Sequence, residues 1–417
     1  MHPAPSSNAD AFFFPSLFWM LIFLFFLFLI SSGKRVRPGR MIKRWARLCG
    51  RADEPFLPHD QGMDMEDEAL PEDADKDVEL ENGEFVYYYL VPPKRQHDPN
   101  PHERLTTQLT LESYHRLSHG TCVIAPRGEE AFCKVKFMPF SSMSPEELRG
   151  WEKLVCFFLD YTNYVEPVKN NGPLMGGEMW AGGWRKSSKR GESFGRYCSV
   201  QRLVAMMEQC LYNPQDEAAA FREPNDWIAL HLQEMAPGIF DKYREVLIGN
   251  SLPSMGSMEY HTPYEALDFA SFFTFTMYNF FNKDHQDTDA NNWTLVCWIP
   301  IFNPQTSSET DPILADEGLD MRGGQFTFRD FQVYLDLNEV VGVTFCVFKS
   351  NDHTHQTLKG VSHSDKYTRI GFSCQMSEKM SNAVVAYIQA KSANKAKKIA
   401  GQQVQIAQAK ARLARKR

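Results

Sequence analysis

Two clusters of histidines and acidic side chains in the second half of the chain have a spacing that suits a metal ion. In the first, residues 282–287 (NKDHQD), His285 and Asp287 flank a single residue. On an extended chain, side chains two residues apart project to the same face, so an imidazole and a carboxylate can occupy adjacent positions around one metal. The second cluster, about seventy residues later at 348–357, offers His353 and His355.

Such a ligand set leaves two chemistries open. Two imidazoles and one carboxylate on one face form the facial triad of non-haem Fe(II) oxygenases, which leaves positions free for a bidentate co-substrate and dioxygen. Three protein ligands plus a water molecule also suit zinc-dependent hydrolysis. The residue types alone do not separate these two possibilities.

A single cation stands in an apolar stretch fourteen residues after His355. The segment 367–373 reads YTRIGFS and contains Arg369. A buried guanidinium needs an anionic partner, and arginine can grip a carboxylate with two parallel hydrogen bonds. Its partner is either a structural Asp or Glu or the distal carboxylate of a 2-oxoglutarate bound to the same iron.

The second half of the chain contains the strands that must position these residues. The nearly continuous apolar run at 293–301 (WTLVCWIPI) is typical of a buried strand. Residues 325–337 alternate in polarity, and their phase slips near 329–330, which predicts a bend or bulge. Further strands are expected at 340–348 and 367–376.

The first half reads as helical. Residues 144–147 (SPEE) form a capping box with proline at the first helical position, and apolar residues follow at helical spacing. Helices are also expected at 200–212 and 264–280. Helices followed by strands predict an α+β fold with the sheet curled around a site.

Composition excludes several classes of protein. The 417 residues are 43% hydrophobic and carry a net charge of −7, so the chain is neither wholly disordered nor a polycation. Its nine cysteines form no C-x-x-C pair, which argues against a zinc ribbon and a disulfide scaffold.

Charge and hydropathy are strongly sorted along the chain, which suggests four segments. Residues 1–33 form a hydrophobic leader whose apolar run, 12–30, is long enough to cross a bilayer. Residues 34–84 form a linker that is first basic and then acidic, and it is expected to be disordered. A globular domain is expected at 85–390, with its β-rich core at about 265–385, followed by a basic helical tail at 391–417.

The order of the motifs resembles the TET/JBP group of Fe(II)- and 2-oxoglutarate-dependent dioxygenases, most closely a large fungal branch associated with transposons. The resemblance covers about 190–385. It is carried by NFFN at 279–282 with HQDTD at 285–289, GGQF at 323–326, HQT at 355–357 and TR at 368–369.

This resemblance implies a double-stranded β-helix, or jelly-roll, with flanking helices. His285, Asp287 and His355 would ligate Fe(II), and Arg369 would bind 2-oxoglutarate, with dioxygen as the second co-substrate. Members of the family oxidise the methyl group of 5-methylcytosine, or of thymine in the JBP branch, and the base must leave the DNA stack to reach the iron.

Some assignments stay open under the resemblance. The family's distal histidine is usually followed by Gly-Thr, whereas Gln356 intervenes here. Counting from Phe348 favours His355 as the third ligand, whereas counting back from Leu358 gives His353. The same iron chemistry on a protein or small molecule, or an inactive binding descendant, are the alternative functions.

Contacts to substrate and partners follow less directly. Asn282, Asn291 and Asn292 flank the metal motif and can hydrogen-bond a base edge or cap a loop. DNA is the expected partner, from the resemblance and from the nine basic residues of the tail. The leader predicts membrane anchoring through 12–30 if it is retained, and a nuclear protein if translation starts near Met41.

Overall fold

The computed structural model describes residues 77–79, 85–91, 94, 111–169, 175–188, 192–209, 214–260 and 263–414. In this part of the chain, no helix is both long and apolar enough to cross a bilayer. The predicted location, membrane-anchored or nuclear, is corrected accordingly, because nothing in the described residues supports either. The apolar run 12–30 lies outside the described residues.

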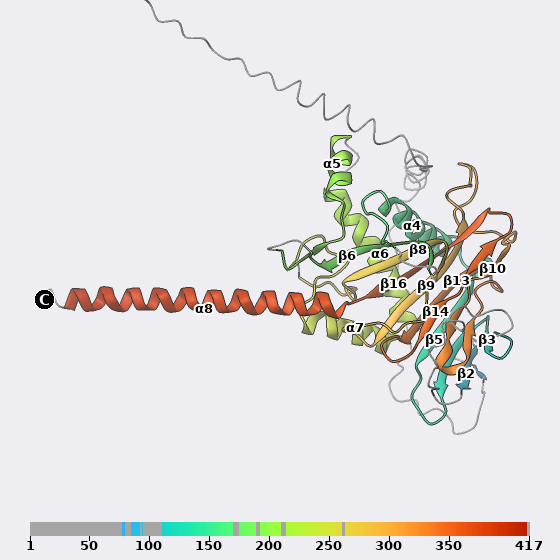
Figure 1. Cartoon of the computed structure of the whole chain (residues 1–417), viewed down its shortest axis with the longest axis horizontal. Coiled ribbons are helices and arrows are strands. Elements are labelled where there is room, and N and C mark those ends of the chain that lie inside the picture. Colours follow the sequence, from blue (N-terminus) through green and yellow to red (C-terminus); the bar gives the residue numbers. More distant parts are fainter. Residues whose placement is uncertain are drawn as a thin grey trace, which may run out of the picture.

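A ten-stranded sheet forms the frame of the molecule (Figure 1). Its neighbouring strands pair antiparallel, except for β2 and β4, which pair parallel. In spatial order the strands are β1 (Asp77–Glu79), β2 (Phe85–Val91), β4 (Thr121–Pro126), β5 (Cys133–Pro139), β13 (Gly342–Lys349), β9 (Trp293–Phe302), β16 (Tyr367–Gln375), β8 (Phe272–Phe281), β6 (Gly176–Lys186) and β7 (Phe194–Arg196).

Two small sheets complete the β-structure. One has the order β14 (His355–Thr357), β11 (Phe326–Phe328), β12 (Val333–Leu335) and β3 (His115–Leu117), and the other pairs β10 (Met321–Gly323) with β15 (Gly360–Ser362). Phe326 on β11 packs against Trp298 on β9, with ring centroids 4.8 Å apart. The four-stranded sheet therefore faces the large sheet across an aromatic layer, as in a jelly-roll.

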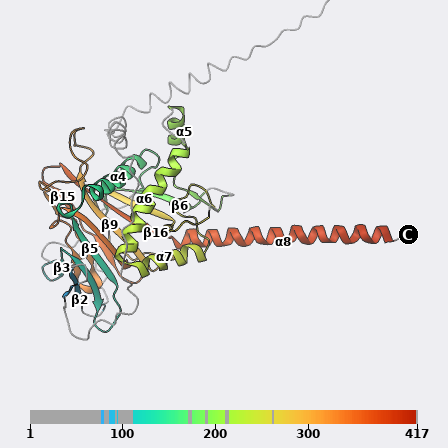
Figure 2. The ribbon, with the colours of Figure 1, turned by 180° about the vertical axis from the view of Figure 1, so that it is seen from behind.

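Helices cover the other face of the large sheet (Figure 2). These are α4 (Pro145–Tyr161), α6 (Pro214–Met235) and α7 (Pro237–Gly249), whereas α5 (Val200–Glu208) extends from their edge. The Ser144 half of the predicted capping box is confirmed, since the hydroxyl of Ser144 accepts a hydrogen bond of 3.2 Å from the Glu147 backbone N–H. The last helix, α8 (Glu378–Ala414), projects away from the body.

The central strands separate their side chains by face. On β8, Phe273, Phe275 and Met277 join the core beneath the helices, whereas Thr274 and Thr276 point into a cavity on the opposite face. Strands β9 and β16 alternate in the same way. This alternation explains why the run at 293–301 contains almost no polar residue, because both of its faces are covered.

Several sequence expectations are confirmed, and one helix is wrong. Strands occupy the regions predicted at 293–301, 340–348 and 367–376, and the short 3-10 helix η2 (Arg329–Phe331) makes the predicted bend between β11 and β12. The helix predicted at 264–280 is instead a loop followed by β8. Its aromatic residues also satisfy strand alternation, and the β-branched Thr274 and Thr276 favour a strand.

The first half is less helical than its sequence suggests. Strands β4, β5 and β6 all belong to the large sheet, whose strands therefore start well before residue 265. A second short 3-10 helix, η1 (Phe140–Ser142), leads from β5 into α4. The fold is α+β as predicted, but its β-layer draws on both halves of the chain.

Candidate functional site

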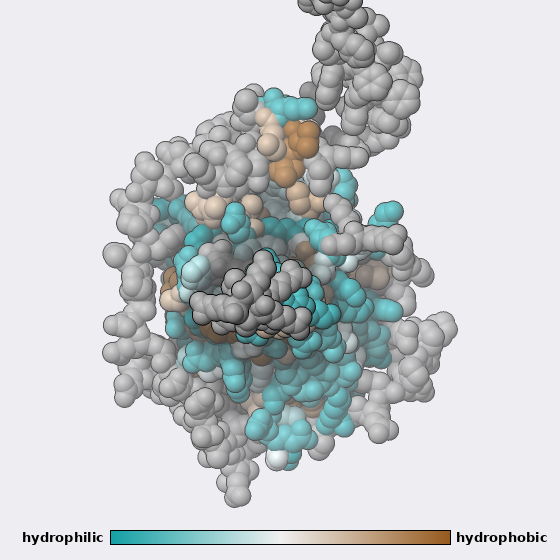
Figure 3. Space-filling view, turned by 90° about the vertical axis from the view of Figure 1, so that its left-hand side faces the viewer, coloured by the Kyte–Doolittle hydropathy of each residue, from teal (hydrophilic) through white to brown (hydrophobic). Residues whose placement is uncertain are grey.

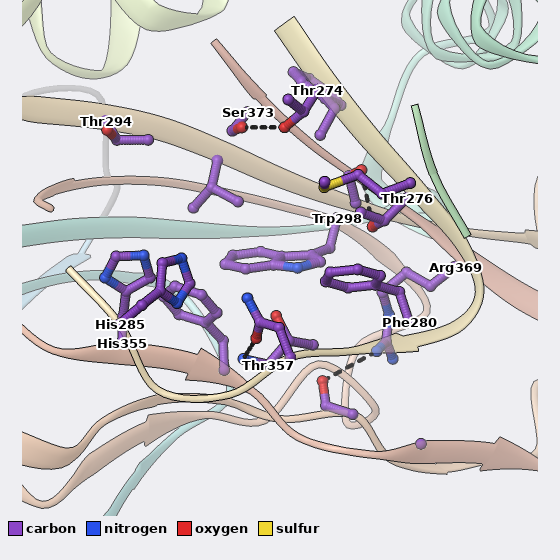
Figure 4. Close-up of a pocket in the computed structure, with 18 of the residues that line it drawn as sticks. Thr274, Thr276, Phe280, His285, Thr294, Trp298, His355, Thr357, Arg369 and Ser373 are labelled. Carbon is purple, nitrogen blue, oxygen red and sulfur yellow. Dashed lines mark hydrogen bonds between the residues drawn. The ribbon is translucent and has the colours of Figure 1, made fainter. Parts of the chain in front are cut away.

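A cavity of about 290 Å³ lies between the two facing sheets and contains most of the residues singled out from the sequence. His285, Asp287, His355, Arg369 and Asn282 all line it. Figure 4 shows the imidazoles of His285 and His355 side by side at one end and Arg369 at the other, with the rings of Trp298 and Phe280 between them.

Backbone hydrogen bonds join the two metal-ligand motifs. The His285 N–H donates to the His355 carbonyl at 3.1 Å, and the His355 N–H donates to the His285 carbonyl at 3.0 Å. Three residues earlier, the Asn282 N–H donates to the Thr357 carbonyl at 3.2 Å. The segment that follows β8 thus runs antiparallel to β14, which brings residues seventy positions apart in sequence into register.

Each imidazole is held with the same nitrogen facing the cavity. Nδ1 of His285 lies 3.1 Å from the Lys283 carbonyl, and Nδ1 of His355 lies 3.1 Å from the His353 carbonyl. A carbonyl only accepts hydrogen bonds, so each Nδ1 carries the proton and each Nε2 keeps a free lone pair. The two Nε2 atoms lie 3.7 and 3.9 Å from the carboxylate oxygens of Asp287.

The three side chains form a compact donor set. One donor atom from each of His285, Asp287 and His355 lies within 4.8 Å of the others, which is close enough for all three to share one ion. Two imidazole nitrogens and a carboxylate oxygen fit Fe(II), and the open cavity beside them leaves room for further ligands. The residues present therefore fit the Fe(II) ion that the sequence resemblance implies.

Neighbouring polar groups fix the orientation of Asp287. Gln375 Nε2 donates to Oδ2 of Asp287 at 3.0 Å, and the Thr294 hydroxyl lies 3.5 Å from the same oxygen. The Asp287 N–H donates to the Ser350 carbonyl at 3.1 Å. These contacts hold one carboxylate oxygen in place, so that the group can meet a metal without a search over rotamers.

Burial favours the uncharged forms of His355 and Asp289. Burial and the neighbouring His285 lower the pKa of His355 to about 4, which favours the neutral, metal-binding imidazole. Burial and the nearby Asp287 raise the pKa of Asp289 to about 8, so this second carboxyl is mostly protonated near neutral pH.

His353, the alternative third ligand, occupies a different environment. Its ring packs between Phe132 and Phe331, with a centroid distance of 4.9 Å to each. Burial lowers its pKa to about 4. It does not line the cavity, and it contributes no atom to the compact donor set.

Arg369 is buried on β16 and faces neutral acceptors. Its guanidinium donates to the Leu337 carbonyl and to Oδ1 of Asn338, both at 2.9 Å, and to the Gly324 carbonyl at 3.4 Å. Among the described residues, none accepts a hydrogen bond from its Nε, and no carboxylate forms an ion pair with it. Burial lowers the pKa of Arg369 to about 10.

Gly324 makes room for this guanidinium. A Cβ at position 324 would lie 2.9 Å from Nη1 of Arg369, and the residue has φ +71°, which glycine adopts without strain. The result is a partly unsatisfied, buried cation at the end of the cavity away from the imidazoles. Such a group fits the distal carboxylate of 2-oxoglutarate.

The three asparagines predicted as substrate contacts separate into two groups. Asn282 lines the cavity, but its Oδ1 already accepts a hydrogen bond from the Thr357 N–H at 2.8 Å. Asn291 is buried next to β9, and Asn292 donates to Asp352 at 2.6 Å. Neither Asn291 nor Asn292 lines the cavity.

Sequence reasoning missed several supporting residues. Gln356, which stands where the family usually has glycine, donates through Nε2 to the Asn282 carbonyl at 3.0 Å. Arg329 is buried and pairs with Asp284 at 2.9 Å, immediately before His285. Gln375 could have been found, because it shares one face of β16 with Arg369 at even spacing.

Comparison with known proteins finds one matching family. The family model of the Tet-like 2OG-Fe(II) oxygenase superfamily matches residues 144–360. A prolyl-4-hydroxylase from Pseudomonas putida is among the similar solved structures, at 15% identity and a TM-score of 0.26, covering 59% of this chain and 93% of that one. No curated protein matches the chain.

The family match spans more than half of the chain, and it implies Fe(II), 2-oxoglutarate and dioxygen as cofactor and co-substrates. Bound iron in this class activates dioxygen at the expense of 2-oxoglutarate, and the protein contributes positioning and a dry site. This chain belongs to the Tet-like 2OG-Fe(II) oxygenase superfamily and is a 2-oxoglutarate-dependent dioxygenase.

Proposed function

We propose that this dioxygenase oxidises the methyl group of 5-methylcytosine, or of thymine, in DNA. His285, Asp287 and His355 hold the iron in this proposal, and Arg369 anchors 2-oxoglutarate. The observation that carries it is one cavity with a compact His-Asp-His donor set at one end and, at the other, a buried guanidinium that no described carboxylate pairs with.

Each residue has a defined task. His285 and His355 offer their Nε2 lone pairs because Nδ1 of each is engaged by a carbonyl. Asp287 supplies the negative charge, and Gln375 keeps its carboxylate aimed at the imidazoles. Arg369 receives the distal carboxylate, which replaces part of the hydration that the guanidinium lost on burial.

The cavity walls suit a flat, mostly apolar group that carries a methyl carbon. Phe280, Trp298 and Phe348 supply aromatic surface, and Met179 adds a flexible thioether. A base enters such a pocket only after leaving the DNA stack, and aromatic walls repay part of the lost stacking.

Helix α8 supports DNA as the partner. From residue 391 to the end the chain contains nine basic residues and no acidic one. Lys391, Lys395, Lys397 and Lys398 are exposed on the part of α8 that projects from the body. Figure 3, which views the molecule from that side, shows a mainly hydrophilic surface around the helix.

The reaction is tested by incubating the full chain with Fe(II), ascorbate, 2-oxoglutarate and methylated DNA, and then analysing bases and succinate by mass spectrometry. Oxidised 5-methyl bases, formed together with succinate and absent in H355A, would support the proposal. Succinate without any modified base would point to a protein or small-molecule substrate. No succinate with any substrate would indicate an inactive descendant.

The DNA partner has a separate test that does not depend on chemistry. DNA affinity is measured against salt for the wild type and for a variant with Gln at positions 391, 395, 397 and 398. If each lysine neutralises one phosphate, the slope of log K against log salt falls in magnitude by about 3 to 4. An unchanged slope would remove α8 from the DNA interface.

A further inference from the structure

Strand β8 contains a strained bulge at the rim of the cavity. Tyr278 and Asn279 both have positive φ, at 61° and 57°, although neither is glycine. In the pairing with β6, Gly176 lies opposite Phe281 and Glu178 lies opposite Met277. Three residues of β8 therefore oppose the single residue Gly177 on β6, which is a wide departure from regular pairing.

The surrounding structure supports this bulge on both sides. Gly177 has φ +69°, and a Cβ at this position would lie 2.5 Å from the Phe280 Cα, so only glycine fits. On the other side, the Tyr278 N–H donates to the Thr368 hydroxyl at 3.0 Å. Left-handed backbone at non-glycine residues costs free energy and persists where its surroundings impose it, often at functional sites.

The bulge redirects side chains into the cavity. In a regular strand, consecutive residues point to opposite faces. Asn279 and Phe280 are consecutive, yet both line the same cavity. The distortion therefore places two consecutive residues, Asn279 and Phe280, in the wall of the same cavity.

The side-chain amide of Asn279 has a hydrogen-bond acceptor that no described residue uses. Its Oδ1 is buried and accepts no hydrogen bond. The other hydroxyl and amide groups nearby are paired, since Thr274 bonds Ser373 at 2.7 Å and Thr276 donates to the Gly371 carbonyl at 3.2 Å. Among the described residues that line the cavity, only Asn279 and Arg369 have a buried side-chain polar atom without a partner.

These two atoms are of opposite kinds. Arg369 Nε is a donor and suits an anion, whereas Asn279 Oδ1 is an acceptor and suits an N–H group. A buried acceptor without a donor is costly, so a ligand that brings an N–H is favoured over one that brings a second acceptor. The unpaired oxygen thus points to the chemistry of the substrate and not to that of the anionic co-substrate.

We propose that Asn279 is a specificity-determining residue whose Oδ1 accepts a hydrogen bond from the exocyclic amine of 5-methylcytosine. This inference rests on the proposed function. On a pyrimidine oxidised at its C5 methyl group, the adjacent C4 carries an amine in 5-methylcytosine and a carbonyl in thymine. Asn279 therefore selects 5-methylcytosine over thymine, while the Phe280 ring forms part of the wall beside it.

The test compares turnover of two oligonucleotides that differ only in carrying one 5-methylcytosine or one thymine at the target position. N279G removes the amide and relieves the backbone, because glycine adopts φ +57° freely. N279D keeps an oxygen acceptor of the same size. Y278F is the matched control, since it alters the same bulge at a residue that does not line the cavity.

In N279G we expect kcat/KM for 5-methylcytosine to fall by about tenfold to a hundredfold, and the preference over thymine to collapse. In N279D the preference should persist or increase, because thymine would place its carbonyl against a carboxylate. Y278F should keep the wild-type ratio. In all three variants, Fe(II) binding and the KM for 2-oxoglutarate should stay within about twofold of wild type.

An unchanged base preference in N279G overturns the inference. So does a loss of 5-methylcytosine turnover in N279D equal to that in N279G, because the amide N–H would then be the contact. A raised KM for 2-oxoglutarate in N279G would assign the residue to the co-substrate and also overturn it. In these cases the wild type still oxidises 5-methylcytosine, whereas a wild type that oxidises neither base refutes the proposed function as well.

Discussion

Replacing the buried guanidinium of Arg369 with an apolar side chain should have opposite effects on the free protein and on its complex with 2-oxoglutarate. In the free protein the hydrogen-bond partners of Arg369 among the described residues are all neutral, so its charge is poorly compensated. In the complex, the same charge would meet a carboxylate. Arg369→Met separates the two situations because methionine fills much of the volume without any charge.

The effect on the free protein follows from two opposing quantities. Burial lowers the pKa of Arg369 from 12.5 to about 10, which means that the fold disfavours the charge by about 3 kcal/mol. Removing the guanidinium deprives three acceptors of a donor, at about 1 kcal/mol each. These quantities nearly cancel, so the free energy of unfolding should change by less than about 2 kcal/mol.

The complex should respond much more strongly. Removing one partner of a buried charge pair costs about 2–5 kcal/mol, so the Kd for 2-oxoglutarate should rise by about thirtyfold or more. At 2-oxoglutarate equal to 100 times the wild-type Kd, the ligand stabilises the wild type by about 2.7 kcal/mol. A hundredfold weaker variant would gain only about 0.4 kcal/mol.

Denaturant melts with and without 2-oxoglutarate, in the presence of Mn(II), measure both effects. Arg329→Met is the matched comparison, because Arg329 is equally buried but pairs with the carboxylate of Asp284. It should destabilise the free protein by about 2–4 kcal/mol, since it removes a buried ion pair to the Asp284 carboxylate. The reasoning is refuted if R369M keeps the full 2-oxoglutarate stabilisation, or if its free form is destabilised as much as R329M.

Three further predictions concern the same site. H355A should weaken Fe(II) binding by at least about a hundredfold in a metal titration. H353A should still bind iron, but it should lose about 1–3 kcal/mol of unfolding free energy, because His353 packs between two phenylalanines. Burial lowers the pKa of both His353 and His355 to about 4, so the metal-free protein should lose stability as the pH falls from about 6.5 to 4, by up to about 3 kcal/mol per histidine. Thermal melts across this pH range should show a smaller loss of stability for H353F than for the wild type. A pH profile of H353F identical to that of the wild type would contradict this role of His353. G324A should raise the KM for 2-oxoglutarate and destabilise the fold by about 1–2 kcal/mol, because its Cβ would lie 2.9 Å from the Arg369 guanidinium at a positive φ.

Local pattern was sufficient to predict much of the strand-rich half. Alternation along β16 predicted the face of that strand on which Arg369 lies. The spacing of His285 and Asp287 predicted that their two side chains share a face, and all three residues line the cavity. The bend at η2 was visible because the polarity pattern changes phase there. Alternating polarity predicts strands well, because each face of a strand packs against one kind of environment.

The same reasoning failed where one pattern fits two structures. Phe269, Phe273 and Met277 recur at helical spacing, yet Phe273, Phe275 and Met277 also alternate, and the sheet partners β6 and β16 select the strand. The sequence also could not decide whether His353 or His355 is the third metal ligand, because the two histidines lie only two residues apart and either fits the motif. What separates them is the backbone pairing of His355 with His285, a contact across seventy residues.

Residues that support the site through long-range contacts were beyond local pattern. Gln375, Gln356 and Arg329 donate hydrogen bonds to Asp287, to the Asn282 carbonyl and to Asp284, so they help to hold the segment that carries His285 and Asp287. Among the described residues that line the cavity, only Arg369 and Asn279 keep a buried side-chain polar atom without a partner. A folded chain tolerates such atoms at a cost of about 1–3 kcal/mol each, and a ligand recovers that free energy when it binds. We infer that the metal is held where these residues position Asp287 and the imidazoles, and that the two unpaired atoms of the cavity wall mark where co-substrate and substrate supply the missing groups.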